Sequence, residues 1–458
     1  MNDQNKQRTS AVVVGSGVAG LTAAYRLQQA GFDVVVLEAK DMPGGRMGDE
    51  LRGSFNAYTG ASGLFAFYRD MWDLLEELGI KDQLMSFPVM MGQGIADNGE
   101  KTYDLDFNRT LSMLWHQGLS LRSRLRLATL IPDFVAARRK VDPCLLHTAA
   151  DFDDESLSDY LTRKVGADFV EHVVGPVYRN LWAWNIEDIS RAYFLSIYAH
   201  VRGQPSYVLK GGLGLLTRTL AKRVQVRYRT RAVAIRRAGV DLKRVVEYTS
   251  PTGNGELRAD IVVCAVEGFR ASQLVRDQAP YERAFFFGGV PYAQYSMLHY
   301  VVKKIRKECP VPTFFARKHR NPISFMLTQA GNPQAAGDPP RIWVVVGPDR
   351  APHYFGLNGE NFEPVVRQFV REKYPLADED ILEVHEMQND YTIAAFPTGQ
   401  LRRVRTFLAS QESGPKNIYY VGDYLSNATT GGACASGHRT AKQIIRDWSA
   451  GAQIAKIA

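Results

Sequence analysis

The feature that most constrains the fold is an apolar run that ends in a glycine-rich turn near the start of the chain. Residues 11–14 read Ala-Val-Val-Val and are followed by Gly15-Ser16-Gly17-Val18-Ala19-Gly20. This pattern predicts a buried strand, a tight turn at Gly15, and a helix that packs closely on the strand at Gly20. Gly17, Val18 and Ala19 then lie at a helix N-terminus, which favours bound phosphate. The motif therefore predicts a dinucleotide site.

A second strand and an acidic residue complete this first unit. Helical periodicity continues from Leu21 to a break at Gly31, and residues 34–37 read Val-Val-Val-Leu. Glu38 follows directly, at the end of the predicted strand. An acidic residue in this position accepts hydrogen bonds from a ribose hydroxyl. The first 40 residues thus predict one βαβ unit that binds a dinucleotide.

The segment Pro43-Gly44-Gly45-Arg46 extends the motif. It resembles the GG-R segment of the superfamily of FAD-dependent amine oxidases, protoporphyrinogen oxidases and phytoene desaturases. The resemblance implies that the cofactor is FAD, with Arg46 near the pyrophosphate and with Gly45, Gly60 and Ala61 in the same cradle. Glu38 is consistent with the unphosphorylated ribose of the AMP half.

A middle segment carries a second part of the resemblance. Lys210-Gly211-Gly212-Leu213-Gly214 precedes a predicted helix, and strand-like runs follow at residues 224–228, 232–235 and 259–265. By itself this pattern indicates only another α/β unit. Its order resembles the middle of the superfamily's FAD domain, which implies that the backbone of Ala232 meets the adenine.

A third segment lies near the C-terminus. The apolar residues 418–421 lead to Gly422 and Asp423, and Thr430-Gly431-Gly432-Ala433 precedes a predicted helix over residues 434–448. The resemblance places Gly422 and Asp423 at the pyrophosphate and ribityl region. It places Gly432 and Ala433 at a helix N-terminus, where backbone N–H groups stabilise negative charge on the flavin.

These segments predict an α/β protein whose Rossmann-like FAD-binding domain is assembled from residues 8–80, 203–272 and 405–450. The intervening residues 81–202 and 273–404 are expected to form an α+β substrate-binding domain, giving an amine-oxidase-like two-domain fold. We expect residues 81–202 to be mainly helical. The strand-like runs of the second block lie at residues 294–302, 323–327, 341–346 and 381–387.

Catalytic residues are harder to identify. In the amine oxidase branch a lysine on a substrate-domain strand holds a water near flavin N5, and matching that strand to residues 290–300 puts Met297 in its place. A methionine cannot donate a hydrogen bond. Met297 and His299 share one face of a strand, so both are candidates for the cleft. For His299, simple packing or solvation is the alternative.

Aromatic residues gather in the segments expected near the cleft. Most aromatic side chains belong to ordinary cores, but together they favour an apolar or aromatic substrate. No SGGC-like segment precedes the C-terminal motif, so FAD is expected to be bound non-covalently. The candidate substrate-binding residues are Tyr178, Trp182, Tyr207, Tyr391 and Phe396.

The sequence therefore predicts an FAD-dependent oxidoreductase that removes a hydride from a C–N or C–C bond of a hydrophobic small molecule, with oxygen as the simplest electron acceptor. The departure at Met297 favours one alternative, a porphyrinogen- or isoprenoid-type desaturase that uses another acceptor at a membrane surface. A second alternative is a flavin-bound scaffold without turnover.

Composition limits the remaining possibilities. The 458 residues are 45% hydrophobic and 23% charged, which indicates a globular protein with two domains. The four cysteines lie far apart, so we expect reduced thiols, no metal site and a cytoplasmic protein. The polar start argues against a signal peptide, and no apolar run is long enough to span a membrane. No nucleic-acid-binding module is recognisable.

A net charge of +8 favours acidic partners or an anionic membrane, although a solvated basic exterior explains it equally well. Residues 109–140 read as helices that carry leucines beside Arg122, Arg124, Arg126, Arg138, Arg139 and Lys140. A basic amphipathic helix can lie in a membrane interface. Peripheral membrane contact through this segment is therefore one prediction, and an ordinary solvated helix face is the alternative. The oligomeric state is left open.

Overall fold

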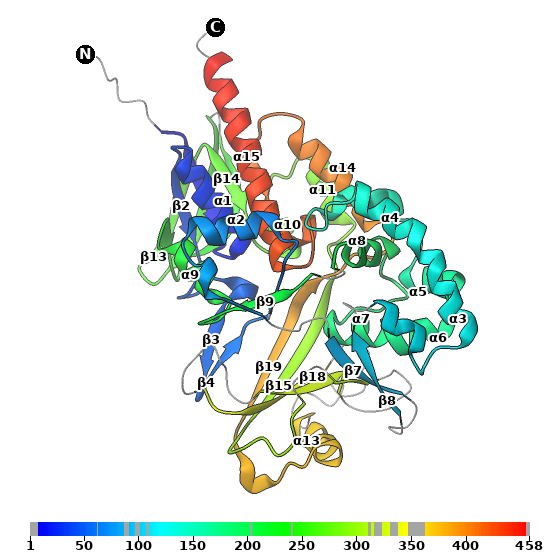
Figure 1. The fold of residues 1–458 in the computed structure, drawn as a ribbon. Helices are drawn as coiled ribbons and strands as arrows, with labels where there is room; N and C mark the ends of the chain where they lie inside the picture. The colour runs from blue at the N-terminus through cyan, green and yellow to red at the C-terminus, as the bar shows by residue number, and fades with distance from the viewer. Residues whose placement is uncertain are drawn as a thin grey trace.

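The parallel sheet predicted from the glycine motifs is present in the computed structural model (Figure 1). The structure describes residues 8–61, 63–86, 91–96, 101–106, 110–201, 204–239, 241–309, 313–315, 323–329, 338–346 and 362–454. Five strands lie in the order β10, β2, β1, β14, β20, and every pair is parallel. Their bounds are Ser10–Val14 (β1), Asp33–Leu37 (β2), Gln225–Arg227 (β10), Ile261–Cys264 (β14) and Ile418–Tyr420 (β20).

This sheet takes strands from all three segments that carry the cofactor motifs. β1 and β14 are almost wholly buried because they lie in its middle and have helices or a second sheet on each face. Helix α1 (Val18–Gln29) packs against α15 (Thr430–Ile454) so closely that a Cβ added at Gly437 would lie 2.2 Å from the carbonyl oxygen of Ala19. The predicted α/β class is confirmed; the domain boundaries stay a prediction.

Two differences from the predicted elements lie in this part of the chain. Helix α15 begins at Thr430, four residues before the predicted start, because the glycines of the motif form its first turn. The second sheet consists of β11 (Arg231–Ala238), β12 (Asp241–Ser250) and β13 (Gly253–Ala259). The strand β13 was not predicted, since its sequence has two glycines and little apolar alternation.

A seven-stranded sheet forms the other large part of the molecule. Its order is β19, β15, β18, β17, β16, β7, β8. The bounds are Met91–Ala96 (β7), Lys101–Asp106 (β8), Tyr292–Val302 (β15), Thr313–Phe315 (β16), Phe325–Gln329 (β17), Arg341–Val346 (β18) and Ile381–Ala394 (β19). In Figure 1 the long strands β15 and β19 rise side by side from this sheet toward the parallel sheet.

Strands β7 and β8 form a hairpin within residues 81–202, a block that is otherwise mainly helical, as expected. Gly92 and Gly94 disfavour a helix, and β7 pairs in parallel with β16 over Gln93 to Ile95. This pairing joins residues more than two hundred positions apart and cannot be recognised from local periodicity. Apart from these two strands and a short one at Leu84–Ser86, the described elements of the block are helices, most of which lie at the right of Figure 1.

The helical block comprises η4 (Thr110–Trp115), α3 (Leu121–Arg126), η5 (Leu127–Leu130), α4 (Ile131–Lys140), η6 (Leu146–Phe152), α5 (Leu157–Lys164), α6 (Ala167–Phe169), the π-helix η7 (Val170–Val174), α7 (Gly175–Leu181) and α8 (Arg191–Val201). The other helices are α2 (Arg69–Glu77), α9 (Gly214–Ala221), α10 (Gly268–Leu274), α11 (Pro280–Phe287), α13 (Phe362–Lys373) and α14 (Gln400–Glu412). Short strands are β3 (Asp49–Arg52), β4 (Phe55–Tyr58), β5 (Leu64–Phe65), β6 (Leu84–Ser86) and β9 (Ser206–Leu209). Within the described ranges, no helix is both long and apolar enough to cross a bilayer.

A buried carboxylate connects the helical block to α14. Asp153 is fully buried and accepts hydrogen bonds from the backbone N–H groups of Gly399 (2.8 Å), Leu401 (2.8 Å) and Arg402 (3.1 Å). These groups lie at the N-terminus of α14, where the helix itself provides no acceptors. The carboxylate also complements the positive end of the helix dipole.

We expect Asp153→Ala to lower the free energy of unfolding by about 2–4 kcal/mol, because three buried N–H groups lose a charged acceptor. Urea denaturation measures the change. Asp151→Ala is the matched control, since Asp151 has a side chain that is 67% exposed and pairs with Arg405. Its effect should stay within about 0.5 kcal/mol. Equal effects of the two substitutions would contradict the role assigned to Asp153.

Candidate functional site

A cavity of about 780 Å³ opens at the carboxyl ends of β1, β2 and β14. In open parallel sheets this edge is where ligands bind. The wall includes residues from all three motif segments and from the seven-stranded sheet. Thirteen of the fifteen predicted cofactor residues line it: Gly15, Gly17, Val18, Ala19, Glu38, Gly45, Arg46, Gly60, Ala61, Ala232, Gly422, Asp423 and Ala433.

The first glycine turn presents its backbone to this cavity. Gly15 has φ +107°, and a Cβ there would lie 2.7 Å from the carbonyl oxygen of Ala265. In front of Gly17 the space is open, with no atom within 4 Å of an added Cβ. Gly20 does not line the cavity; a Cβ on it would lie 2.2 Å from the carbonyl oxygen of Gly15. Gly20 therefore serves helix packing, and Gly17 leaves room for a ligand.

Glu38 is held in place at the end of β2. Its Oε2 accepts hydrogen bonds from the backbone N–H (2.9 Å) and the hydroxyl (2.6 Å) of Ser16, and its Oε1 accepts one from the N–H of Lys40 (2.8 Å). A carboxylate has about four lone-pair positions, so it can still accept a bond from a ribose hydroxyl.

Arg46 and Asp423 form a bidentate ion pair on the cavity wall. The two N–O distances are 2.7 and 2.8 Å, and Arg46 also donates to the carbonyl oxygen of Thr392 at 3.1 Å. The guanidinium lies 5.5 Å from the ring centre of Tyr292. The pair thus places a fixed cation beside the glycine turns, where a pyrophosphate would need one.

The residues of the C-terminal motif, from Gly431 to Ala433, have different surroundings. Ala433 lines the cavity, whereas Gly432 packs into a turn in which an added Cβ would lie 2.4 Å from the carbonyl oxygen of Asn427. The N–H groups of both residues bond to Thr429, at 3.1 and 3.0 Å. Gly431 is covered by the ring of Tyr68. The start of α15 therefore faces the cavity with its dipole, while these two N–H groups are satisfied internally.

Together these residues fit a dinucleotide. The open space at Gly17, the carboxylate of Glu38 and the cation of Arg46 lie along one continuous cavity. This polar part of the cavity presents backbone groups and polar side chains from the three motif segments. Across the described parts of the chain, no cluster of three or more His, Cys, Asp or Glu side chains is arranged for a metal ion.

The other part of the cavity wall is apolar and carries no charged residue. It is lined by Phe65, Tyr68, Leu181, Trp182, Met297, Phe325 and Trp343. Of these, only Trp182 and Met297 were predicted. Phe325 and Trp343 lie on β17 and β18, whose strand-like runs were recognised. Their position beside Met297 depends on strand pairing, which the sequence does not reveal.

Met297 and His299 share a strand but only one of them lines the cavity. Met297 lines the cavity and is paired with Val345 and Met387 on the neighbouring strands. His299 does not line it: this side chain is 3% exposed, with its ring centre 5.8 Å from that of Trp343 and 4.9 Å from that of Phe55. It lies two residues farther along β15, directly opposite Trp343 on β18, and packs against Trp343 and Phe55 instead of facing the cavity.

The environment of His299 keeps it neutral. Burial, reinforced by the positive charge of Arg341, lowers the pKa of the imidazole to about 3. Neither ring nitrogen has a hydrogen-bond partner among the described residues. This histidine is therefore a packed aromatic ring at physiological pH.

The predicted substrate residues are divided in the same way. Trp182 and Tyr391 line the cavity, and Tyr178, Tyr207 and Phe396 do not. Tyr178 stacks behind Trp182 with the ring centres 5.4 Å apart, and Phe396 stacks on Tyr193. Tyr207 packs edge-on against Trp72. These three follow the alternative stated for aromatic residues, ordinary core packing.

A hydrogen-bond chain supports the apolar wall. The indole N–H of Trp182 donates to the hydroxyl of Tyr193 at 3.0 Å, and that hydroxyl donates to Oδ1 of Asn427 at 3.0 Å. Burial raises the pKa of Tyr193 above its usual range, so the hydroxyl stays protonated. The chain connects the helical block to the turn before α15 and fixes the indole ring at the cavity.

Comparison with known proteins adds family membership to this geometry. A family model described as flavin containing amine oxidoreductase matches residues 18–445. Curated relatives include a Drosophila melanogaster protein named "Possible lysine-specific histone demethylase 1", 38% identical over 23% of this chain and 12% of the relative. Protoporphyrinogen oxidase 2 of Arabidopsis thaliana is 27% identical over 36% of this chain and 30% of the relative. The chain thus aligns with less than a third of either relative.

Solved structures of the same fold cover nearly the whole chain. Putrescine oxidase has a TM-score of 0.73, 17% identity, and coverage of 96% of this chain and 99% of the other. Cyclohexylamine oxidase from Brevibacterium oxydans has a TM-score of 0.71, 16% identity, and coverage of 96% and 100%. At these identities the likeness establishes the fold alone.

We expect Arg46→Gln to weaken FAD binding about 10- to 100-fold, because the cation beside the pyrophosphate is lost and Asp423 is left unpaired. Quenching of flavin fluorescence during titration of the apoprotein measures the affinity. Arg270→Gln is the control, since Arg270 lines the same cavity but is 47% exposed and pairs with Glu267. Losses of equal size in both variants would refute a specific role for Arg46.

His299→Phe tests the pKa assignment through stability. Above pH 6.5 the imidazole is neutral in both states, whereas at lower pH the unfolded chain binds a proton that the folded protein excludes down to a pKa of about 3. Stability is therefore lost as pH falls through this window. The substitution should lower the acid slope of the unfolding free energy by up to about 1.4 kcal/mol per pH unit between pH 6 and 4. An unchanged slope would mean that His299 protonates in the folded state.

Proposed function

This chain belongs to the flavin containing amine oxidoreductase family, so its cofactor is FAD, and we propose that it oxidises a hydrophobic small molecule by removing a hydride from a C–N or C–C bond. The observation that carries the proposal is the composition of the cavity wall. Every charged residue on it lies within residues 8–80, 203–272 or 405–450, and the part of the wall around Met297, Phe325 and Trp343 is apolar. Such a wall favours a substrate that is uncharged where it meets these side chains.

Each part of the wall has a definable role in this reaction. Bound FAD supplies the hydride acceptor. Arg46 would hold its pyrophosphate and Glu38 its ribose, and the dipole of α15 would favour negative charge near Ala433. Trp182, Trp343 and Met297 exclude water and orient the substrate, since none of them donates or accepts a proton at physiological pH.

Two reactions fit this wall. The first is oxidation of the substrate with oxygen, the simplest electron acceptor. A desaturase acting on a porphyrinogen or isoprenoid with another acceptor at a membrane surface is the second candidate, and Met297 favours it because a thioether cannot hold a water by donating to it. The porphyrinogen oxidase activity named for the Arabidopsis thaliana relative supports the same candidate.

Anaerobic reduction of the holoenzyme separates these possibilities. We expect an apolar substrate to bleach the flavin more than about tenfold faster than a short diamine of equal concentration, because no described carboxylate faces the apolar wall. Admission of air then tests oxygen as acceptor. Failure of every amine, porphyrinogen and polyene to bleach the flavin would favour the non-catalytic scaffold.

Met297 can be tested in the same assay. Met297→Lys should change the rate of flavin reduction at least about tenfold, because it introduces a charge into the apolar wall. Met297→Leu, which keeps the volume and polarity, should change it less than about threefold. FAD content checks that both variants fold. Equal rates in all three proteins would exclude Met297 from the substrate region.

A further inference from the structure

Exposed apolar side chains are concentrated on one edge of the helical block. Of the twelve large hydrophobic residues that are exposed in the described structure, six lie between positions 114 and 135. We call this set the apolar ridge; it consists of Leu114, Trp115, Leu121, Leu125, Ile131 and Val135. Trp115 and Leu121 are each 73% exposed. Contiguous patches of this kind mark interaction surfaces in otherwise water-soluble folds.

The ridge lies on the side of α3 and α4 that does not pack in the protein core. Leu121 and Leu125 lie four residues apart on α3, and Ile131 and Val135 four apart on α4, so each pair shares a helix face. The opposite side of α4 has its own apolar contacts inside the protein. Ala137 there is fully buried, and the ring of Phe134 lies 5.7 Å from that of Phe194 on α8.

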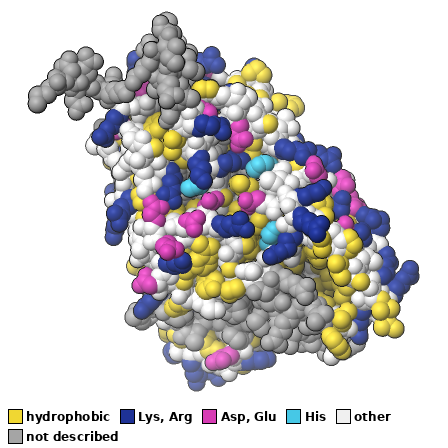
Figure 2. All heavy atoms as spheres, turned by 45° about the horizontal axis from the view of Figure 1, so that its top comes forward, with side chains coloured by type: hydrophobic (Ala, Val, Ile, Leu, Met, Phe, Trp, Pro, Cys, Tyr) yellow, Lys and Arg dark blue, Asp and Glu magenta, His cyan; other side chains and the backbone are white. Residues whose placement is uncertain are grey.

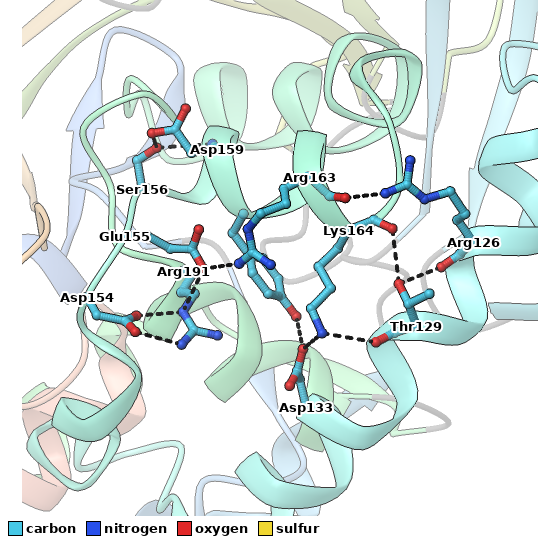
Figure 3. A network of polar contacts seen from close by, with 11 residues as sticks. Arg126, Thr129, Asp133, Asp154, Glu155, Ser156, Asp159, Arg163, Lys164 and Arg191 are labelled. Atoms are coloured by element: carbon cyan, nitrogen blue, oxygen red, sulfur yellow. Dashed lines mark hydrogen bonds and ion pairs between the residues drawn. The ribbon is translucent and has the colours of Figure 1, made fainter.

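Polar contacts fix the inner side of these helices, as Figure 3 shows. Asp133 accepts a hydrogen bond from Tyr160 at 2.7 Å and pairs with Lys164 at 2.8 Å. The hydroxyl of Thr129 donates to the carbonyl oxygen of Lys164 at 3.0 Å. Arg191 pairs with Asp154 on the other side of the network. Because η5 and α4 are held from within, the ridge is presented outward on a fixed support.

Basic residues surround the ridge. Residues 110–140 contain six Arg or Lys and a single acidic residue, Asp133, which is turned inward to Lys164. Arg122, Arg139 and Lys140 are exposed and form no ion pair within the described structure. At the right-hand edge of Figure 2, where α3 and α4 lie in Figure 1, hydrophobic side chains stand among Lys and Arg.

We propose that the apolar ridge and its basic rim dock onto the surface of a bilayer that contains anionic lipids. The exposed leucines would enter the interface while the arginines meet lipid phosphates. Trp115 suits the boundary between headgroups and acyl chains. A second copy of this chain is a poorer occupant, because a symmetric contact would bring the two basic rims together. This inference does not depend on the proposed oxidation.

Vesicle co-sedimentation of the holoenzyme tests the proposal. We expect binding to vesicles of phosphatidylcholine mixed with phosphatidylglycerol at least about tenfold stronger than to phosphatidylcholine alone, and weakened by salt. Absence of binding to the mixed vesicles at low salt would overturn the proposal.

Two pairs of substitutions locate the surface. Leu121→Ser with Leu125→Ser, and separately Arg122→Glu with Arg139→Glu, should each reduce the bound fraction at limiting lipid about tenfold or more. The control for the first pair is Leu51→Ser, at a side chain 68% exposed on β3, on the other side of the molecule in Figure 1. Lys222→Glu with Arg258→Glu is the control for the second, since it changes the net charge equally.

The controls should bind within about twofold of the unsubstituted protein, and all variants should keep their FAD because the changed residues are exposed. Equal losses in the ridge and control variants would mean that binding is not localised to the ridge, and would overturn the assignment. So would self-association of the unsubstituted protein in sedimentation velocity that Leu121→Ser with Leu125→Ser abolishes, since the ridge would then be an interface between copies.

Discussion

The ion pair between Arg46 and Asp423 is the contact on which the site depends. Arg46 belongs to the first motif segment and Asp423 to the last, yet their two hydrogen bonds measure 2.7 and 2.8 Å. A third bond from Arg46 reaches Thr392 on β19, a strand of the other sheet. One guanidinium thereby fixes three distant parts of the chain around a single cavity, and still presents its charge to that cavity.

The parallel sheet was predictable because each of its motifs is local. An apolar run that ends in a turn specifies a strand end whatever lies elsewhere in the chain, and the three runs before Gly15, Val266 and Gly422 form adjacent strands. The sheet on the substrate side of the cavity was harder to predict from the sequence. Its strands were mostly recognised as strands, but the pairing of β7 with β16 joins segments without any local signal.

The same distinction explains which site residues were found. Gly17, Glu38 and Arg46 belong to motifs that fit a cofactor whose shape recurs, so their spacing is informative. The residues of the apolar wall have no comparable spacing motif. Phe325 and Trp343 reach this wall only through strand order, and His299, two residues beyond Met297 on the same strand, packs against Trp343 and Phe55 outside the cavity lining. Period two gives the face of a strand, but it does not show where along that face the cavity ends.

Both the cavity and the surface of the helical block keep particular kinds of side chain on separate sides. Within the cavity, the charged groups lie in the three chain segments that carry the motifs, and the apolar wall comes mostly from β15, β17, β18 and the end of α7, with Phe65 and Tyr68 from the first segment. On the helical block, Asp133 is turned inward to Lys164, so the exposed side of α3 and α4 keeps its apolar side chains and its uncompensated positive charge. Because a partly buried acid that pairs with a neighbouring lysine adds little to the outer field, this arrangement gives the edge a basic character that exceeds what the overall net charge implies.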